Sequence, residues 1–231
     1  FLSFFIVASF FFNLRADEGM WIPMLLQNNE QEMQEMGMNI TAEDIYSINH
    51  SSMKDAVVLF DGGCTGEIVS NQGLLLTNHH CGFDWIQYHS TVEHDYLTHG
   101  FWAMSQEEEL PCPGISAVML KSMEDVTDRV LEGVTKETSN DERAEIVTEN
   151  IKKIKEEAEA NSDYQVVIKS FYHGNKYYMI YNEVFKDVRL VGAPPSNIGK
   201  FGGDTDNWVW PRHTGDFSVF RIYVSPDGEA A

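Results

Sequence analysis

The pattern of hydrophobic and polar positions divides the chain into an early helical part, a β framework and one helical insertion. Residues 17–54 carry apolar side chains at helical spacing, and Thr41 stands as an N-cap ahead of acidic first-turn residues. The period then changes to short aliphatic or β-branched runs between Gly-rich turns, which is typical of strands. The runs that predict strands are 55–60, 65–70, 73–80, 115–123, 164–172, 176–194 and 217–224.

Between about residue 122 and residue 163 the composition becomes acidic and helical. Two apolar stripes recur at helical spacing, and "TSND" at 138–141 supplies a cap for the second helix. We interpret this segment as a helical insertion whose charges form a solvated face. The stripes are Val126, Val130, Leu131 and Val134, then Ile146, Val147, Ile151 and Ile154. The many short strands around it favour an antiparallel barrel or sandwich.

The composition bounds the partners of the chain. Its 231 residues are 43% hydrophobic, enough to bury a core as one large domain or two small ones. Its formal net charge is −20, from 36 acidic and 16 basic residues. A surface this negative repels phosphate backbones and anionic lipid headgroups, so we expect neither nucleic acid nor a membrane surface as a partner.

The N-terminal stretch is predicted to be a remnant of a secretory signal, residues 1–16. Residues 1–12 are almost wholly apolar, which suits the core of a signal and is too short for a bilayer span of about 20 residues. Cleavage after Ala16 would leave Asp17 as the mature start, with no membrane span in the mature chain. The absence of an initiator Met and of a basic leader suggests a clipped N-terminus. The alternative is a buried N-terminal helix.

The three cysteines fit an exported protein. Cys64 and Cys81 flank a predicted hairpin, where a bridge would close a loop of about 17 residues and contribute about 3 kcal/mol in the loop-entropy model. Cys112 is left over, as a free thiol or with a partner that this chain lacks.

The pair His79 and His80, directly before Cys81, is the first candidate for chemistry. A nucleophilic serine needs a neutral imidazole to accept its proton and a carboxylate to hold that imidazole in one tautomer. In barrel proteases this histidine sits where a strand gives way to a short helix, next to a bridging cysteine. Side chains alternate along a strand, so only one of the two can face the site, and we take His80 as the general base.

Metal binding is the competing interpretation of the same region. His79, His80, His89, His94 and His99 lie close together in the sequence. The spacing of the last three matches neither i,i+4 on a helix nor the Cys/His spacing of common zinc sites, so we expect no metal.

The orienting carboxylate must come from a distant strand. Asp216 lies just before the strand predicted at 217–224, while Asp204 and Asp206 are alternatives in the preceding loop. An Asx-turn remains open for Asp204 and Asp206, and a capping role remains open for Asp216. That loop is long and irregular and carries Trp208, Trp210 and Arg212, which is more typical of a functional loop than of a simple connection.

Two long motifs carry a resemblance to a known family. "GGCTGEIVSNQGLLLTNHHCGFDWIQYHSTVEHDYLTHGFWA" and "GGDTDNWVWPRHTGDFSVFRIY" closely resemble the bacterial dipeptidyl-peptidase family that includes dipeptidyl-peptidases 7 and 11. The members are exported serine exopeptidases of Gram-negative bacteria, so the resemblance implies a periplasmic or cell-surface location. It runs from about Asp17 to the end of the chain, which looks like the N-terminal third of such an enzyme.

The resemblance implies a mainly β fold with helical additions: a chymotrypsin-like antiparallel β-barrel, the N-terminal part of a double-barrel peptidase that is usually a homodimer. Residues 17–231 would then be the N-terminal part of the catalytic domain. It implies that His80 is the general base and Asp216 the orienting acid. Asn207 and Trp208 would hold the free amine of a peptide substrate, since an amide oxygen and a π-face both suit an ammonium group.

The family's serine nucleophile lies hundreds of residues further on in a "GNSGSP"-like motif, so the chain is expected to stop before it. Ser218 and Ser225 follow Asp216 too closely and lack a Gly-x-Ser-x-Gly setting. We therefore expect a dipeptidyl aminopeptidase that acts on peptides with a free N-terminus, uses no cofactor, and is inactive as this chain alone. The alternative is a non-catalytic exported module that grips peptide N-termini.

Overall fold

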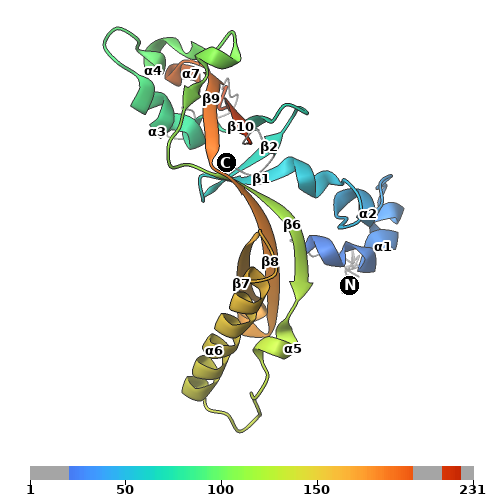
Figure 1. Ribbon diagram of the computed structural model, residues 1–231. Coiled ribbons are helices and arrows are strands. Elements are labelled where there is room, and N and C mark those ends of the chain that lie inside the picture. The colour runs from blue at the N-terminus through green and yellow to red at the C-terminus, as the bar shows by residue number, and fades with distance from the viewer. Residues whose placement is uncertain (1–20, 200–214, 225–231) are drawn as a thin grey trace, which may run out of the picture.

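The computed structural model describes residues 21–199 and 215–224 (Figure 1), so the predicted signal remnant lies outside it. The strands of the described part are β1 (Val57–Phe60), β2 (Cys64–Ile68), β3 (Leu74–Thr77), β4 (Phe101–Trp102), β5 (Leu110–Pro111), β6 (Ala117–Asp125), β7 (Gln165–Phe171), β8 (Lys176–Phe185), β9 (Asp187–Ala193) and β10 (Ser218–Tyr223). The α-helices are α1 (Glu30–Glu35), α2 (Ala42–Ile45), α3 (His79–His89), α4 (Tyr96–His99), α5 (Thr127–Val130), α6 (Asn140–Glu159) and α7 (Ser196–Gly199). The 3-10 turns are η1 (Pro23–Asn28), η2 (Met53–Ala56), η3 (Gln106–Glu108) and η4 (Tyr172–Gly174).

The antiparallel pairing of these strands closes into a barrel. Hydrogen-bonded pairs run from β1 through β2, β3, β10 and β9 to β5. β6 pairs with β1 and, through Ala117, with Phe185 of β8, which continues through Lys186 into β9 and so completes the ring. The predicted mainly β fold with added helices is therefore confirmed.

The barrel closes around the apolar positions that the period-two pattern marks. Val58 and Phe60 on β1 are buried, while Val57 and Leu59, which alternate with them along the strand, are exposed. Phe220 on β10 is fully buried and its ring centroid lies 4.7 Å from that of Phe60, within the range of a favourable aromatic pair. The core of the barrel comprises Val58, Phe60, Leu75, Ile86, Cys112, Ile115, Ala117, Phe185, Val188, Leu190, Ala193 and Phe220.

Cys112, left over in the sequence, is a free thiol inside this core. Only 2% of its surface is exposed, and burial raises the pKa of the thiol to about 12. A thiol reacts as its thiolate, so this cysteine contributes packing rather than chemistry.

A second unit extends from the barrel as an arm (Figure 1). Beyond its contact with β1, β6 pairs with β8, and β8 pairs with β7, so that three strands run out of the barrel together. α6 packs on β7 and forms a separate core with Val126, Val130, Ile154, Val166, Tyr177 and Met179. The predicted cap of α6 is present: Ser139 accepts a hydrogen bond from the Glu142 N–H and forms a capping box.

The helical insertion begins later than the sequence suggested. Residues 122–125 belong to β6, because Ser122 to Asp125 pair with Tyr181 to Tyr178 of β8. The first apolar stripe forms only the short helix α5, whereas the second forms the 20-residue helix α6. Tertiary strand pairing has here overridden a local helical pattern.

The N-terminal helices lie beside β6 (Figure 1). Thr41 caps α2 through a capping box with Asp44, as its position predicted. The Met123 N–H of β6 donates a 2.8 Å hydrogen bond to the Tyr46 hydroxyl, which ties this segment to the sheet. Within residues 21–199 and 215–224, no helix combines the length and the apolar composition that crossing a bilayer requires.

A buried valine and an exposed valine provide a matched test of the barrel core. Val58 is 1% exposed and Val92 is 98% exposed. Val58→Ala should lower the free energy of unfolding by about 2 kcal/mol, because buried methyl groups are lost and a cavity remains. Val92→Ala should change it by less than about 0.5 kcal/mol. Denaturant titration of both variants measures the difference, and equal losses would contradict this core.

Candidate active site

Pairing of β3 with β10 brings His80 and Asp216 together. Thr77 at the end of β3 lies opposite Ser218 at the start of β10. His80 follows Thr77 in the first turn of α3, and Asp216 directly precedes the β10 residues. The ladder therefore places two residues that are 136 positions apart in the sequence at the same rim of the barrel.

The two side chains are in direct contact. His80 Nδ1 lies 2.9 Å from Asp216 Oδ2, and the His80 main-chain N–H donates to Oδ1 of the same carboxylate at 3.1 Å. With Nδ1 donating to the carboxylate, the imidazole is held in the tautomer that leaves Nε2 as a proton acceptor. The His80 side chain is 52% exposed, while that of Asp216 is 18% exposed. The acceptor nitrogen thus belongs to an accessible base with a largely buried carboxylate behind it.

A disulfide fixes the helix turn that carries His80. Cys81, the next residue, is joined to Cys64 on β2, with their Cα atoms 6.1 Å apart. The Thr77 hydroxyl at the end of β3 donates a 2.8 Å hydrogen bond to the Thr65 carbonyl, which is also on β2. The bridge that the sequence predicted is present, and it links the start of α3 covalently to the barrel wall.

His79 and His80 both lie on α3, so the alternation argument used for a strand does not apply to them. Adjacent side chains on an α-helix are about 100° apart, which still sends the two rings in different directions. The His79 ring is fully buried, with Nε2 3.5 Å from the Ser196 hydroxyl. Burial lowers the pKa of His79, and the charge of Asp216 opposes that shift. His79 is therefore a neutral packing residue beside the base.

Of the predicted site residues, the structure brings together His80, Asp216, Cys64 and Cys81. Asn207 and Trp208 lie outside the described residues, as do Asp204 and Asp206. Sequence reasoning did not identify Asn78, whose amide nitrogen lies 3.4 Å from Asp216 Oδ2. The sequence signal that could have identified Asn78 is its position as a potential N-cap residue directly before His79 and His80.

The metal alternative was raised by five histidines near each other in sequence. In the described residues, the one group of three possible ligands within 4.8 Å consists of Cys64, His80 and Cys81. The sulfur atoms of Cys64 and Cys81 are bonded to each other, so neither is available as a thiolate ligand. His89 instead places Nε2 2.9 Å from the Pro111 carbonyl. The donor set at His80 is therefore that of a histidine–carboxylate pair.

A buried polar cluster at the other end of β10 was also missed from the sequence. Glu109, 5% exposed, accepts a hydrogen bond from Arg221 Nε at 2.9 Å and another from the Tyr223 hydroxyl at 2.6 Å. Burial and the Glu109 carboxylate raise the pKa of Tyr223 to about 12. These bonds tie the segment before β5 to β10 and hold in place the strand that follows Asp216.

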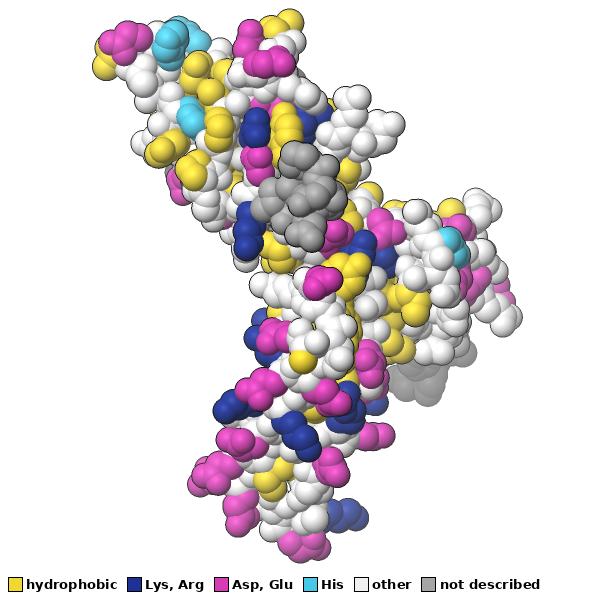
Figure 2. Space-filling view, in the orientation of Figure 1, with side chains coloured by type: hydrophobic (Ala, Val, Ile, Leu, Met, Phe, Trp, Pro, Cys, Tyr) yellow, Lys and Arg dark blue, Asp and Glu magenta, His cyan; other side chains and the backbone are white. Residues whose placement is uncertain are grey.

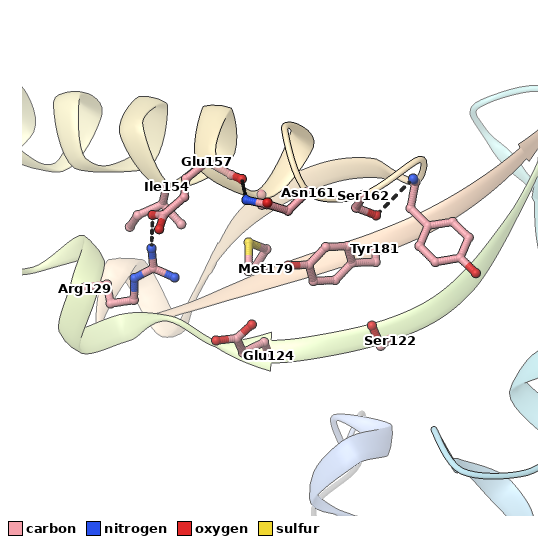
Figure 3. Close-up of a pocket in the computed structure, with 11 residues that line it drawn as sticks. Ser122, Glu124, Arg129, Ile154, Glu157, Asn161, Ser162, Met179 and Tyr181 are labelled. Carbon is pink, nitrogen blue, oxygen red and sulfur yellow. Dashed lines mark hydrogen bonds and ion pairs between the residues drawn. The ribbon is translucent and has the colours of Figure 1, made fainter.

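The arm holds a pocket of a different kind (Figure 3). There the Arg129 guanidinium forms a 2.7 Å ion pair with Glu157, which extends from α6 above the strands. Asn161 donates to the Glu157 main-chain carbonyl at 2.8 Å. These groups satisfy each other, which favours a structural role for the pocket.

Acidic side chains crowd the lower part of the arm in Figure 2. On α6 the exposed ones are Asp141, Glu142, Glu145, Glu149, Glu156, Glu157 and Glu159. They form the solvated face that the charge pattern of the sequence predicted.

Comparison with known proteins gives one consistent result. The family model described as Peptidase S46 matches residues 16–231. The chain is 56% identical over 214 residues to an Asp/Glu-specific dipeptidyl-peptidase of Flavobacterium psychrophilum, which covers 92% of this chain and 30% of that protein. It is 49% identical over 235 residues to dipeptidyl-peptidase 7 of Capnocytophaga gingivalis, covering 100% of this chain and 33% of that protein.

Among solved structures, the chain is similar to DPP11 of Porphyromonas endodontalis in complex with the dipeptide Arg-Glu. The TM-score is 0.79 at 50% sequence identity, and the match covers 93% of this chain and 32% of that one. The chain thus spans about a third of the length of the relatives and structures it matches.

The buried His79 should make stability depend on pH. Its pKa is lowered in the folded state, so the unfolded chain takes up a proton first as the pH falls through about 6.5. Folded-state stability is therefore lost below that pH and retained above it. His79→Gln should flatten this loss, whereas replacement of the exposed His99 by Gln should not. Denaturant titrations between pH 7.5 and 5.0 test this, and an unchanged slope in His79→Gln would contradict it.

Proposed function

The chain belongs to the peptidase S46 family, and we propose that it supplies the general base and the orienting acid of a serine-type dipeptidyl aminopeptidase. The observation that carries this proposal is the 2.9 Å contact between His80 Nδ1 and Asp216 Oδ2. The nucleophilic serine and its oxyanion donors would belong to the part of the full-length protein that follows residue 231.

In the proposed mechanism, His80 Nε2 accepts the proton of the serine hydroxyl as its oxygen attacks the peptide carbonyl. Asp216 holds the imidazole in place and stabilises the imidazolium that forms. His80 then returns the proton to the leaving amine, and a water molecule activated in the same way releases the dipeptide. The half-exposed ring of His80 and the more buried carboxylate of Asp216 suit these two roles.

We further propose that Asn207 and Trp208 hold the free amine of the substrate. An ammonium group removed from water needs acceptors, which an amide oxygen and an indole face both provide. Anchoring the amine at a fixed distance from the nucleophile would make the cut fall after the second residue. The dipeptide Arg-Glu bound to the related DPP11 supports a substrate of this class.

Substitution of the two proposed catalytic residues in the full-length enzyme tests the proposal. His80→Ala should reduce turnover of a dipeptide-releasing substrate by at least about 10⁴-fold, and Asp216→Asn by roughly 10³- to 10⁴-fold. His94→Ala, at an exposed position, is the matched control and should change turnover by less than about threefold. Near-normal turnover in His80→Ala would refute the proposal. Peptide binding without any turnover in the wild-type protein would favour the non-catalytic module.

We also propose that residues 1–16 are removed on export to the periplasm or cell surface. Residues 17–231 would then form the N-terminal part of the catalytic domain. The full-length protein would be a homodimer. The apolar stretch at residues 1–12 and the Cys64–Cys81 disulfide support export. The protein recovered outside the inner membrane should begin at Asp17 and sediment at twice the mass of one chain. An intact apolar N-terminus, or a single-chain mass, would contradict the corresponding part.

A further inference from the structure

The start of α3 lies directly against β10, and Gly82 makes this approach possible. A Cβ atom at Gly82 would lie 2.7 Å from the Ser218 hydroxyl oxygen and 2.9 Å from Cζ of Phe220. Both of those residues are fully buried, so neither has open space into which to move. The backbone of Gly82 has no positive φ, and alanine is intrinsically the better helix former. The glycine is therefore explained by the close packing of the helix on the strand.

Asn78 provides a second link between the same two elements. It is the N-cap residue of α3, yet its side chain accepts no capping hydrogen bond. Its amide instead donates to Asp216, at 3.2 Å from the main-chain oxygen and 3.4 Å from Oδ2. The Asn78 carbonyl accepts a 2.8 Å hydrogen bond from the Ser218 hydroxyl.

Asp216 takes over the capping role that Asn78 leaves open. Its Oδ1 accepts the His80 main-chain N–H at 3.1 Å, which satisfies one of the unpaired donors at the start of the helix. The carboxylate thus receives hydrogen bonds from the His80 main chain and the Asn78 amide in addition to its contact with the His80 ring. Both oxygens are fixed, and with them the direction in which Oδ2 faces the imidazole.

We propose that Asn78 and Gly82 are positioning residues that set the distance and orientation between His80 and Asp216. This inference rests on the proposed function. His80 belongs to α3 and Asp216 to the residues that lead into β10, so the packing distance between these elements is also the separation of base and acid. Gly82 permits the close packing, and the Asn78 amide holds the carboxylate in the matching orientation.

The proposal concerns catalysis through the histidine–carboxylate pair and not contact with substrate. A helix displaced from β10 would lengthen the bond between Nδ1 and Oδ2, and the imidazole would less often present the acceptor tautomer at Nε2. The rate of the chemical step should fall while substrate affinity stays nearly constant.

Four variants of the full-length enzyme form two matched pairs. Gly82→Ala is compared with Gly63→Ala, since a Cβ at Gly63 meets nothing within 4 Å and its φ is not positive. Asn78→Ala is compared with Asn161→Ala, which removes an exposed side-chain bond to a main-chain carbonyl on the arm. We expect Gly82→Ala and Asn78→Ala to lower kcat by about 10- to 100-fold with KM within about twofold. Both controls should stay within about twofold.

The isosteric variant Asn78→Asp separates positioning from packing. It keeps the shape of the side chain but replaces the amide donor with a second carboxylate beside Asp216, and the two negative charges repel. Its kcat, measured on the pH plateau of the variant, should fall at least as far as that of Asn78→Ala. A residue with only a packing role would retain activity in Asn78→Asp.

The outcomes separate this inference from the proposed function. Wild-type kcat in both Asn78→Asp and Gly82→Ala would overturn the inference, even if His80→Ala is inactive. Normal turnover in His80→Ala would instead overturn the proposed function itself. If Gly82→Ala fails to fold, shown by loss of its cooperative thermal transition, Asn78→Asp decides by the same criterion.

Discussion

The antiparallel pairing of β3 with β10 is the constraint on which the site depends. It places Thr77 opposite Ser218, and the residues just beyond this pair, His80 and Asp216, meet at the rim of the barrel. Side chains change face with every residue along a strand, so a register shift by one residue would turn Ser218 out of the core and remove Asp216 from the imidazole. The buried residues Phe220 and Leu75 oppose such a shift, because a slip by one residue would expose one of them.

The site is held in place by contacts on two sides of the start of α3. The Cys64–Cys81 bridge and the Thr77–Thr65 hydrogen bond hold the start of α3 against β2. On the other side, the Ser218 hydroxyl binds the Asn78 carbonyl, and the Glu109 cluster anchors the far end of β10. The helix turn that carries His80 is thus held by β2 and β10, the two strands on either side of β3. Such rigid support suits a base that must meet its acid at hydrogen-bond distance.

The barrel and the arm divide the molecule by chemistry as well as by shape (Figures 1 and 2). The barrel contains the histidine–carboxylate pair, the disulfide and the larger core. The arm has its own smaller core and exposes a row of acidic side chains on α6. Both units lie within the region that the peptidase S46 family model matches, and together they span about a third of the length of the relatives named above.

The sequence alone determined what depends on local period and on short motifs. It predicted the strands around residues 57–77, the capped helix that begins after Ser139 and the Cys64–Cys81 bridge, while the pairing of His80 with Asp216 was expected only from the family resemblance of two long motifs. Only the tertiary structure decided that the strand continues through residues 124–125, that Glu109 is buried, and that Asn78 and Gly82 seat α3 on β10. The reason is physical: helix caps and side-chain alternation involve neighbours in sequence. In contrast, the partners of Asn78 and Glu109 lie more than a hundred residues away, and no local pattern of the chain records them.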